Sequence, residues 1–325
     1  MRIGIVGAGA IGGLIGIPLA RRGHLVSALA RGHTLTALRS GWSLERGGER
    51  IESHVRAADD AAALGTQDVL IFAVKGPSLA EAARSAGPML GPDSLVVTAM
   101  NGVPWWFLLA GAGNLPPTRL ETVDPHGEIA QAIPIGSVIG CVVHATAQVR
   151  APGAVIHHGG NRLILGEPDG AFSQRLEMLA DVFDDTGLEV ERSANIRRDI
   201  WYKLWGNMTM NPISAIAGAT CDRIIGDELV RAFALKVMAE AAEIGNRIGC
   251  EIRESGEERL EIARTLGAFR TSMLQDAEAA RPLEIDALLA APREIARHLS
   301  VPTPNIDTLL GLTRLYARTR GLYPA

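Results

Sequence analysis

Residues 3–20 read IGIVGAGAIGGLIGIPLA, a short apolar run that leads into a glycine-rich turn and then into a helical pattern. Three glycines in this stretch give the spacing G-x-G-x-x-G. In such a turn the first glycine permits a tight bend, the second lets the backbone approach a pyrophosphate, and the third allows close packing of helix on strand. Free N–H groups at the start of the helix then bind the phosphate oxygens. The stretch therefore predicts a dinucleotide site formed by Gly7, Gly9, Ala10, Ile11 and Gly12.

The same stretch approaches the length of a membrane span and contains the apolar run expected of a signal peptide. Six of its eighteen residues are glycines and Pro18 interrupts it, whereas a signal peptide has a cationic start and a leucine-rich centre. The whole chain is 21% charged and 47% hydrophobic, which is the balance of a globular enzyme. We therefore expect a cytoplasmic protein without a membrane partner.

The length of 325 residues predicts roughly two domains, each large enough to bury a core of its own. The net charge of −4, with Lys and Arg scattered among the acids, provides no basic patch of the kind that binds a phosphate backbone. Cys141, Cys221 and Cys250 have neither metal-ligand spacing nor the even count of a disulfide framework. We expect no nucleic-acid partner, no metal site, and cysteines that serve as small buried side chains.

The first part of the chain alternates short β-rich runs with helical stretches, which predicts parallel βαβ units and an α/β domain of the Rossmann type. The expected strands are Arg2–Val6, Leu25–Leu29, Val69–Val74 and Leu95–Thr98, and the expected helices begin at Ala10, Ser78 and Val103. A hairpin is expected at Trp42–Val55, around Gly47-Gly48. Later strands with an antiparallel tendency are expected at Ser137–Val149, Ala154–His158 and Arg162–Leu165, followed by a helix Ser173–Asp184 and a strand Leu188–Glu191.

From Ser193 onward apolar residues recur at helical spacing, which predicts an all-α second domain. The expected helices are Ala194–Met210, Glu228–Ile248, Gly256–Leu266, Ser272–Ala280, Leu283–His298 and Asn305–Thr319. We place the domain boundary between residues 193 and 194, so that residues 1–193 bind the cofactor and residues 194–325 bind the substrate.

The end of the second strand indicates which cofactor is used. A dinucleotide domain that binds NAD carries an Asp or Glu there, which accepts the ribose hydroxyls. This chain reads Leu29-Ala30-Arg31-Gly32, so the acid is missing and Arg31 offers a forked cation for a 2′-phosphate. Arg31 in place of the acid favours NADP(H) over NAD, and a flavin is the less favoured alternative. An arginine at a strand end is also found as a solvated surface charge.

Two further strand ends carry polar residues that point to the same crevice. Lys75 follows the third expected strand, and Asn101-Gly102 follows the fourth. Each motif alone is ordinary turn chemistry. Together, at successive strand ends, Lys75 and Asn101 are candidate cofactor contacts.

One helix of the second domain carries a polar stripe within an apolar segment. Lys203, Asn207 and Asn211 recur at i, i+4 and i+8 and so share one face. Such a stripe is either a solvated or internally bonded face, or a set of groups that faces a substrate. A second polar cluster lies at Thr271–Asp276 and Arg281–Asp286, where we expect Ser272 to cap a helix and Pro282 to separate two helices.

With these motifs the chain resembles the 2-dehydropantoate 2-reductases (ketopantoate reductases) over nearly its whole length. The order of motifs carries the resemblance: a Rossmann glycine loop, a strand-end Arg, a strand-end Lys, an Asn-Gly, a Lys-x3-Asn-x3-Asn helix, and a Ser-Met-x-Gln-Asp…Glu-Ile-Asp segment. The residues that match are Lys203, Asn207, Asn211, Ser272 and Glu284. The resemblance implies a helical second domain of the 6-phosphogluconate-dehydrogenase-like architecture.

The resemblance also implies NADPH-dependent reduction of a 2-oxo acid to a 2-hydroxy acid, most directly ketopantoate to pantoate in pantothenate biosynthesis. Lys203 would donate the proton or a hydrogen bond to the carbonyl oxygen as the hydride arrives. Glu284 would position Lys203 or bind a substrate hydroxyl. Asn207, Asn211 and Ser272 would hold substrate groups, and Asn101 would bridge cofactor and substrate.

The chain departs from the family pattern in two places. Cys221 stands where pantoate-forming members have a further substrate-contacting Asn, and the segment Asn114–Pro134, which includes His126, is longer than a typical connection. His126, His157 and His158 have no metal-ligand spacing. The sequence therefore leaves the identity of the substrate open. The alternative functions are a related hydroxy-acid dehydrogenase with a different substrate, or a non-catalytic NADPH-binding sensor. Apolar helices such as Glu228–Ile248 lead us to favour a homodimer.

Overall fold

The computed structural model describes residues 1–113 and 115–324. Its contacts divide the chain into two compact units. The first unit consists of Met1–Met100 and Gly127–Ile196, and the second of Asn101–His126 and Arg197–Ala325. The second unit therefore takes in a segment, residues 101–126, that lies far ahead of residue 194 in the sequence. The boundary after residue 193 stays a prediction.

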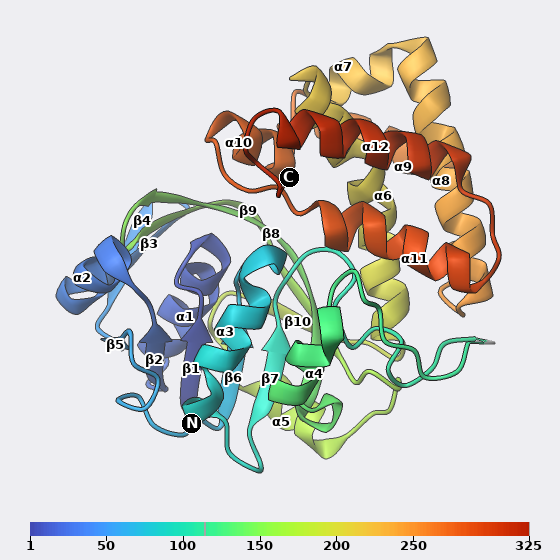
Figure 1. The fold of residues 1–325 in the computed structure, drawn as a ribbon. Helices are drawn as coiled ribbons and strands as arrows, with labels where there is room; N and C mark the ends of the chain where they lie inside the picture. The colour runs from blue at the N-terminus through green and yellow to red at the C-terminus, as the bar shows by residue number, and fades with distance from the viewer. Residues whose placement is uncertain (114, 325) are drawn as a thin grey trace. The chain divides into compact units, whose positions relative to one another are not determined.

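Within the described residues of the first unit, ten strands form one mixed sheet in the order β4-β3-β9-β8-β7-β6-β1-β2-β5, with β10 also paired to β9 (Figure 1). The strands are β1 Arg2–Val6, β2 Leu25–Leu29, β3 Trp42–Arg46, β4 Glu49–Ser53, β5 Arg56–Ala58, β6 Val69–Phe72, β7 Leu95–Thr98, β8 Val138–Ala151, β9 Ala154–Gly166 and β10 Glu189–Arg192. From β5 to β8 every pairing is parallel, which confirms the predicted βαβ units and the Rossmann-type sheet.

Helices cover both faces of this sheet (Figure 1). They are α1 Ala10–Arg21, α2 Gly32–Ser40, α3 Leu79–Ser85, α4 Glu128–Ala132 and α5 Gln174–Asp181. Ile3 and Ile5 of β1 point to the face where α1 and α5 contribute buried leucines to one core cluster. α3 and α4 contact each other outside that cluster, against the other face. Parallel strands buried on both faces explain why β1 and β6 read as continuous apolar runs.

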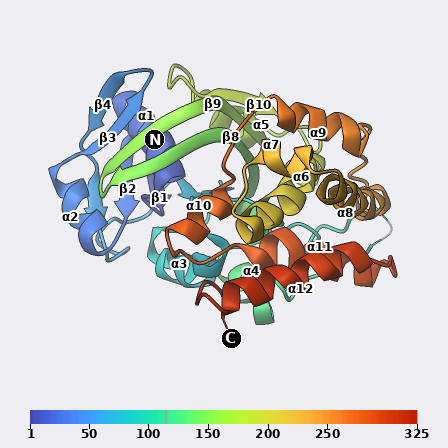
Figure 2. The ribbon, with the colours of Figure 1, turned by 90° about the horizontal axis from the view of Figure 1, so that it is seen from above.

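The predicted hairpin is confirmed, since β3 and β4 pair in antiparallel register around Gly47-Gly48. The prediction of two short strands on either side of Gly159-Gly160 is wrong, because β9 runs through both glycines and pairs with β8 as one long curved ribbon (Figure 2). The register shifts between His144 and Ala147, and Gly160 has φ +70°. The glycine pair thus marks a β-bulge rather than a turn.

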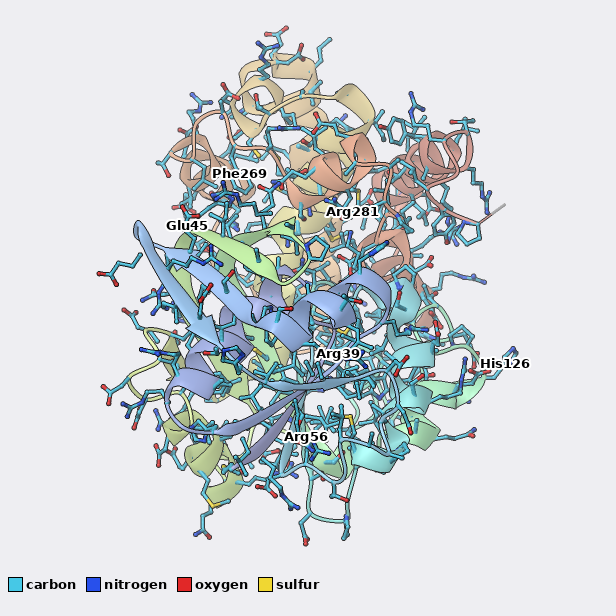
Figure 3. All side chains as sticks on the ribbon, turned by 90° about the vertical axis from the view of Figure 1, so that its left-hand side faces the viewer. Arg39, Glu45, Arg56, His126, Phe269 and Arg281 are labelled. Carbon is cyan, nitrogen blue, oxygen red and sulfur yellow. The ribbon has the colours of Figure 1, made fainter. Side chains whose placement is uncertain are left out.

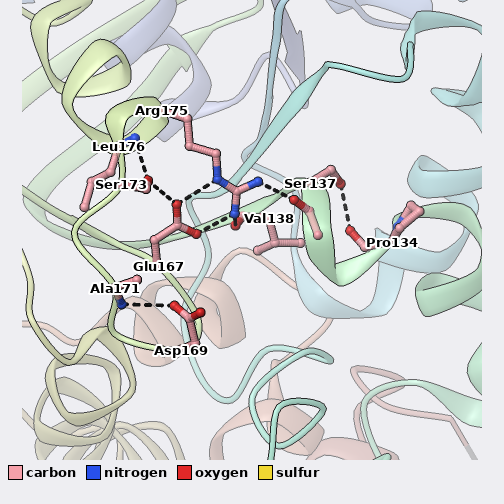
Figure 4. Close-up of polar contacts among 10 residues, drawn as sticks. Pro134, Ser137, Val138, Glu167, Asp169, Ala171, Ser173, Arg175 and Leu176 are labelled. Carbon is pink, nitrogen blue, oxygen red and sulfur yellow. Dashed lines mark hydrogen bonds and ion pairs between the residues drawn. The ribbon is translucent and has the colours of Figure 1, made fainter.

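A buried ion pair ties the end of β9 to the segment that precedes β8 (Figure 4). Glu167 is 4% exposed, and its carboxylate accepts hydrogen bonds from Arg175 and from Ser173. The guanidinium of Arg175 also donates to the carbonyl oxygen of Gly136, and the neighbouring carboxylate raises the pKa of Arg175. This network fixes the α5 start, where Ser173 caps the helix as its side chain accepts from the Leu176 amide.

The predicted helix from Val103 is wrong. Residues 103–111 form successive turns, with i+3 hydrogen bonds such as Phe107 N to Pro104 O, and belong to the second unit. Trp105, Trp106 and Phe107 are fully buried, so the segment has no polar face that would select a surface helix.

The described part of the second unit is helical apart from its connections. Its helices are α6 Ile196–Ala217, α7 Cys221–Gly226, α8 Glu228–Arg247, α9 Gly256–Arg264, α10 Ser272–Glu278, a π-helical turn Asp286–Ala290, α11 Ala291–His298 and α12 Pro304–Arg318. α8 contacts α7, α9, α11 and α12, so it is the central helix of this unit. The all-α second domain of the prediction is confirmed.

The second unit differs from the prediction in three places. α6 continues beyond Met210 and through Pro212. Pro212 removes one amide donor, but the buried apolar residues around it keep the helix packed. The segment Leu283–His298 is not one regular helix, since residues 286–290 form a π turn ahead of α11. α7 was not predicted at all. Among the described residues, no helix has the length and apolar character needed to cross a membrane.

Candidate functional site

The glycine loop of the first unit has the geometry that its sequence requires. Gly7 has φ +101°, a conformation that side chains rarely adopt, and a Cβ there would lie 2.8 Å from the Ala73 carbonyl oxygen. A Cβ on Gly12 would lie 2.1 Å from the Gly7 carbonyl oxygen. The protein itself therefore requires the first and third glycines, the first for the turn and the third for close packing.

The second glycine differs from the other two. A Cβ on Gly9 would meet nothing within 4 Å, so no neighbouring protein atom requires a glycine at this position. Gly9 is the N-cap residue of α1 and provides no side chain to cap the helix. Ala10 and Ile11 follow it in the first turn, half-buried. An open backbone beside the uncapped N-terminus of a 12-residue helix fits a phosphate group of a dinucleotide.

The sheet reverses its strand order at this loop. β1 pairs with β2 on one side and with β6 on the other, so the carboxyl ends of β1 and β6 form a topological switch point. Gly7 directly follows β1, and half-buried Lys75 comes three residues after the end of β6. The structure therefore brings the glycine loop and Lys75 to the same edge of the sheet.

Arg31 lies at the carboxyl end of β2, as the N-cap residue of α2. Its guanidinium donates to the carboxylate of Glu81 on α3 over 2.6 Å, and both side chains are exposed. The hydrogen bond with Glu81 raises the pKa of Arg31 and lowers that of Glu81. Arg31 thus stands where a 2′-phosphate contact is expected, with one carboxylate that a phosphate would have to displace.

Helix α6 of the second unit presents two opposite faces. The indole N–H groups of Trp201 and Trp205 donate to the Ala241 and Met238 carbonyl oxygens of α8, over 3.0 and 2.8 Å. These two anchors, one helical turn apart, fix the rotation of α6 about its axis. Lys203 and Asn207 follow them by two residues and so lie on the opposite, half-buried face.

Lys203 is held by a residue from far ahead in the chain. Its ammonium Nζ donates a hydrogen bond of 2.8 Å to the Oδ1 atom of Asn101. Both residues are half-buried and both belong to the second unit. Two polar groups that the sequence placed on separate motifs therefore meet in one hydrogen bond.

Gly102 fixes the position of Asn101. Gly102 has φ +83°, and a Cβ on it would lie 2.6 Å from the Cβ of Ala287. The amide of Val103 donates to the Ala287 carbonyl oxygen over 2.9 Å. The residues directly after Asn101 are therefore packed against the segment that carries Glu284, three residues before Ala287, and Glu284 is itself half-buried.

The other predicted substrate residues lie on two helices. Asn211, one turn beyond Asn207 on α6, is only 5% exposed. Ser272 is exposed in the first turn of α10, but it does not cap that helix as predicted. The cap is Thr271, whose hydroxyl accepts from the Leu274 amide, because Ser272 is already the first helical residue.

The two departures from the family pattern have distinct surroundings. Cys221 is buried, its amide donates to the Phe269 carbonyl oxygen over 3.0 Å, and burial raises the pKa of its thiol to about 11. Figure 3 labels Phe269 on the second unit. In the segment Asn114–Pro134, Asn114 lies outside the described residues, and the Glu294 carboxylate accepts from the amides of Glu121 and Thr122.

His126, His157 and His158 each have different surroundings. His126 has φ 60°, His157 bonds to the Gly160 carbonyl oxygen, and His158 lies 3.3 Å from Gln148 Oε1. Within residues 1–113 and 115–324 no group of three or more His, Cys, Asp or Glu side chains is arranged to hold a metal ion.

Sequence reasoning missed several residues that shape this site. They are Ala287, Trp201, Trp205 and Arg259, whose guanidinium stacks on the Tyr202 ring. The i, i+4 spacing of the two tryptophans was a usable signal for the anchored face of α6. The contact of Gly102 with Ala287 joins residues too distant in sequence for any local pattern to reveal it.

Comparison with known proteins gives consistent matches along the chain. The family model described as ketopantoate reductase PanE/ApbA matches residues 3–170, and the model of its C-terminal part matches residues 195–317. A 2-dehydropantoate 2-reductase from Mesorhizobium japonicum is 44% identical over 99% of this chain and 100% of that protein.

Solved structures agree with these matches. A protein from Ralstonia solanacearum MolK2, provisionally named a ketopantoate reductase, has a TM-score of 0.95 and 57% identity over 99% of both chains. A PanE/ApbA family ketopantoate reductase from Ralstonia eutropha JMP134 has a TM-score of 0.84 and 27% identity, over 99% of this chain and 100% of that one.

Proposed function

The chain belongs to the ketopantoate reductase family, and on that premise we propose that it reduces a 2-oxo acid, first of all 2-dehydropantoate (ketopantoate), to the 2-hydroxy acid with NADPH. One observation carries the proposal: the half-buried Lys203 ammonium is held by Asn101 on the face of α6 that carries Asn207. A non-catalytic NADPH sensor has no need of an oriented ammonium group there.

The chemistry follows from the groups at this position. The reduced nicotinamide, when bound, supplies the hydride. Carbonyl reduction leaves negative charge on the substrate oxygen, and the Lys203 ammonium donates the hydrogen bond and then the proton to that oxygen. Asn101 orients the ammonium, because its amide oxygen accepts one of the three N–H bonds. Glu284 serves as the second catalytic group that positions Lys203 or binds a substrate hydroxyl.

The proposed substrate contacts are Asn101, Lys203, Asn207, Asn211 and Ser272. Neutral amides and a hydroxyl suit a polar substrate, since each both donates and accepts hydrogen bonds. Asn101 is proposed to contact the cofactor as well. Cys221, a neutral buried thiol where the family has an amide, supports a substrate range that differs from that of the pantoate-forming relatives.

The proposed cofactor contacts are Gly7, Gly9, Ala10, Ile11, Gly12, Arg31, Lys75 and Asn101. The open backbone at Gly9 and the uncapped start of α1 support a pyrophosphate site. The strand-end cation at Arg31, in place of an acid, supports the choice of NADPH over NADH. The homodimer and the cytoplasmic location expected from the sequence stay predictions.

The first experiment follows NADPH absorbance with the purified protein against ketopantoate and a panel of branched and aromatic 2-oxo acids. Each assay is repeated with NADH. We expect turnover with NADPH preference. Turnover on another oxo acid alone would keep the mechanism and change the substrate, whereas tight NADPH binding without turnover on any acid would favour the sensor.

A pair of lysine variants tests the mechanism in the same assay. Lys203→Ala is expected to lose most of the turnover and to retain NADPH binding. Lys236→Ala is the matched control, because Lys236 is an exposed lysine on α8. Equal activity in the two variants would remove Lys203 from the mechanism.

A further inference from the structure

An arginine from α9 lies against the helix that carries Lys203. The Cζ atom of Arg259 is 5.1 Å from the centre of the Tyr202 ring, which places the guanidinium over the ring face. Tyr202 directly precedes Lys203 on α6. A planar cation stacked on an aromatic ring is held in orientation without losing its ability to bind an anion at its edge.

Gly206 makes room for this arginine. A Cβ on Gly206 would lie 2.9 Å from one terminal nitrogen of Arg259 and 3.3 Å from its Nε. The guanidinium therefore occupies the space that a side chain at position 206 would fill. Since Tyr202 and Gly206 are one turn apart, the arginine lies along the surface of α6 rather than across its end.

This part of α6 is the half-buried face that also carries the proposed catalytic lysine. Tyr202, Lys203, Gly206 and Asn207 are all half-buried, whereas Trp201 and Trp205 are buried. Residues three and four apart on a helix are separated by about 5–6 Å between Cβ atoms. Gly206 and Lys203 are three residues apart, so the Arg259 guanidinium at Gly206 lies beside the part of α6 that carries Lys203.

Arg259 lacks the anionic partner that similar arginines nearby possess. Its Nε is buried and makes no hydrogen bond to the described residues, and no carboxylate among them lies within ion-pair distance of it. The Nε of Arg231 is also buried without a hydrogen bond, but Arg231 has an ion pair with Glu257, and Arg264 pairs with Glu261 over 3.3 Å. Because Nε is enclosed, an incoming anion would bind the terminal nitrogens of Arg259, which have no carboxylate partner among the described residues.

We propose that Arg259 is a substrate-binding residue that holds the carboxylate of the 2-oxo acid. The inference rests on the proposed function and adds to it a cation that pairs with the substrate's one obligatory charge. A forked guanidinium binds a carboxylate through parallel hydrogen bonds, and Lys203 on the same helix face then meets the adjacent carbonyl oxygen. Tyr202 and Gly206 are the positioning residues for Arg259.

Two variants test the assignment by different means. Arg259→Ala removes the cation. Gly206→Ala keeps it, but the new Cβ displaces the flexible end of Arg259, and alanine is the better helix former, so α6 is not weakened. Arg264→Ala is the matched control, because Arg264 is an exposed arginine on the same helix.

The readout compares the oxo acid with its neutral amide. We expect Arg259→Ala to raise KM for the acid about 10- to 150-fold, the range for a lost hydrogen bond to a charged group, and to change KM for the amide little. Gly206→Ala should do the same to a smaller extent with an unchanged or higher Tm. Arg264→Ala should match the wild type.

An acid-to-amide ratio of KM values that stays at the wild-type level in both variants would overturn the assignment, as would equal losses on acid and amide. Calorimetric titration of the 2-oxo acid and of its amide into the same four proteins gives a second readout that does not depend on turnover. If the wild type reduces neither compound, the proposed reaction fails. The calorimetric ratio then still decides whether Arg259 binds a carboxylate.

Discussion

The hydrogen bond between Lys203 and Asn101 makes a quantitative prediction about two substitutions and their combination. Lys203→Ala removes the proposed proton donor, and Asn101→Ala removes the oxygen that accepts from Nζ over 2.8 Å. If Asn101 acts mainly by orienting the ammonium group, its loss has no further effect once the ammonium is gone. The two substitutions should then be strongly non-additive.

The role of each group sets the expected loss of activity. Loss of a general acid costs about 10²- to 10⁴-fold in rate, which we expect for Lys203→Ala. A hydrogen bond to a charged group contributes about 1.5–3 kcal/mol, or roughly 10- to 150-fold, which we expect for Asn101→Ala because the bond is half-buried. The double variant should be about as active as Lys203→Ala alone, so the coupling energy should be about 1.5–3 kcal/mol.

The assay is kcat/KM for the oxo acid at saturating NADPH in the wild type, both single variants and the double variant. NADPH affinity is measured in parallel by fluorescence titration, because Asn101 is also a proposed cofactor contact. Additive losses, with a double variant that is slower than Lys203→Ala by the full Asn101→Ala factor, would refute the orienting role of Asn101.

Three further predictions concern the cofactor. Arg31→Ala should weaken NADPH binding by about tenfold or more and leave NADH affinity near that of the wild type, and equal losses for both would contradict a 2′-phosphate contact. Glu81→Gln should lower the Kd for NADPH alone, since it removes the carboxylate 2.6 Å from Arg31, and fluorescence titration with both nucleotides measures this. Gly9→Ala should keep the wild-type Tm but lose NADPH affinity. Gly12→Ala puts a Cβ 2.1 Å from a carbonyl oxygen, so overpacking should destabilise the fold by about 1–3 kcal/mol and lower Tm. The opposite result for the two variants would contradict the roles given to these glycines.

The sequence predicted those elements of the fold whose local pattern and packing agree. β1, β2 and β7 match the predicted bounds because each is a short apolar run buried on the sheet. The helix predicted from Val103 failed since its apolar residues are buried on all sides, and a pattern without a polar face does not distinguish a helix from packed turns. The Gly159-Gly160 pair failed because a bulge and a turn use the same residues, and only pairing with β8 separates them.

The sequence placed Lys203 on the correct helix, but Glu284, expected in a helix from Leu283, lies in the connection ahead of the π turn. It gave no view of the partners of Lys203. Lys203 and Asn207 were found because one helix spaces them regularly. The bond from Lys203 to Asn101 joins residues 102 positions apart, so only the folded chain reveals it. Arg259 was missed for a similar reason, because nothing in the sequence of α9 shows that Gly206 leaves space for its guanidinium.

The division of the chain suggests why the lysine's partner is a strand-end residue of the dinucleotide-binding half of the sequence. The chain passes from the first unit to the second between Met100 and Asn101, directly after β7. Gly102 and Val103, directly after Asn101, contact Ala287 within the second unit. The ammonium and its acceptor, 2.8 Å apart, both belong to the second unit. If contacts within the second unit align the donor without the cofactor, cofactor affinity and the Lys203–Asn101 coupling should be separable in experiments.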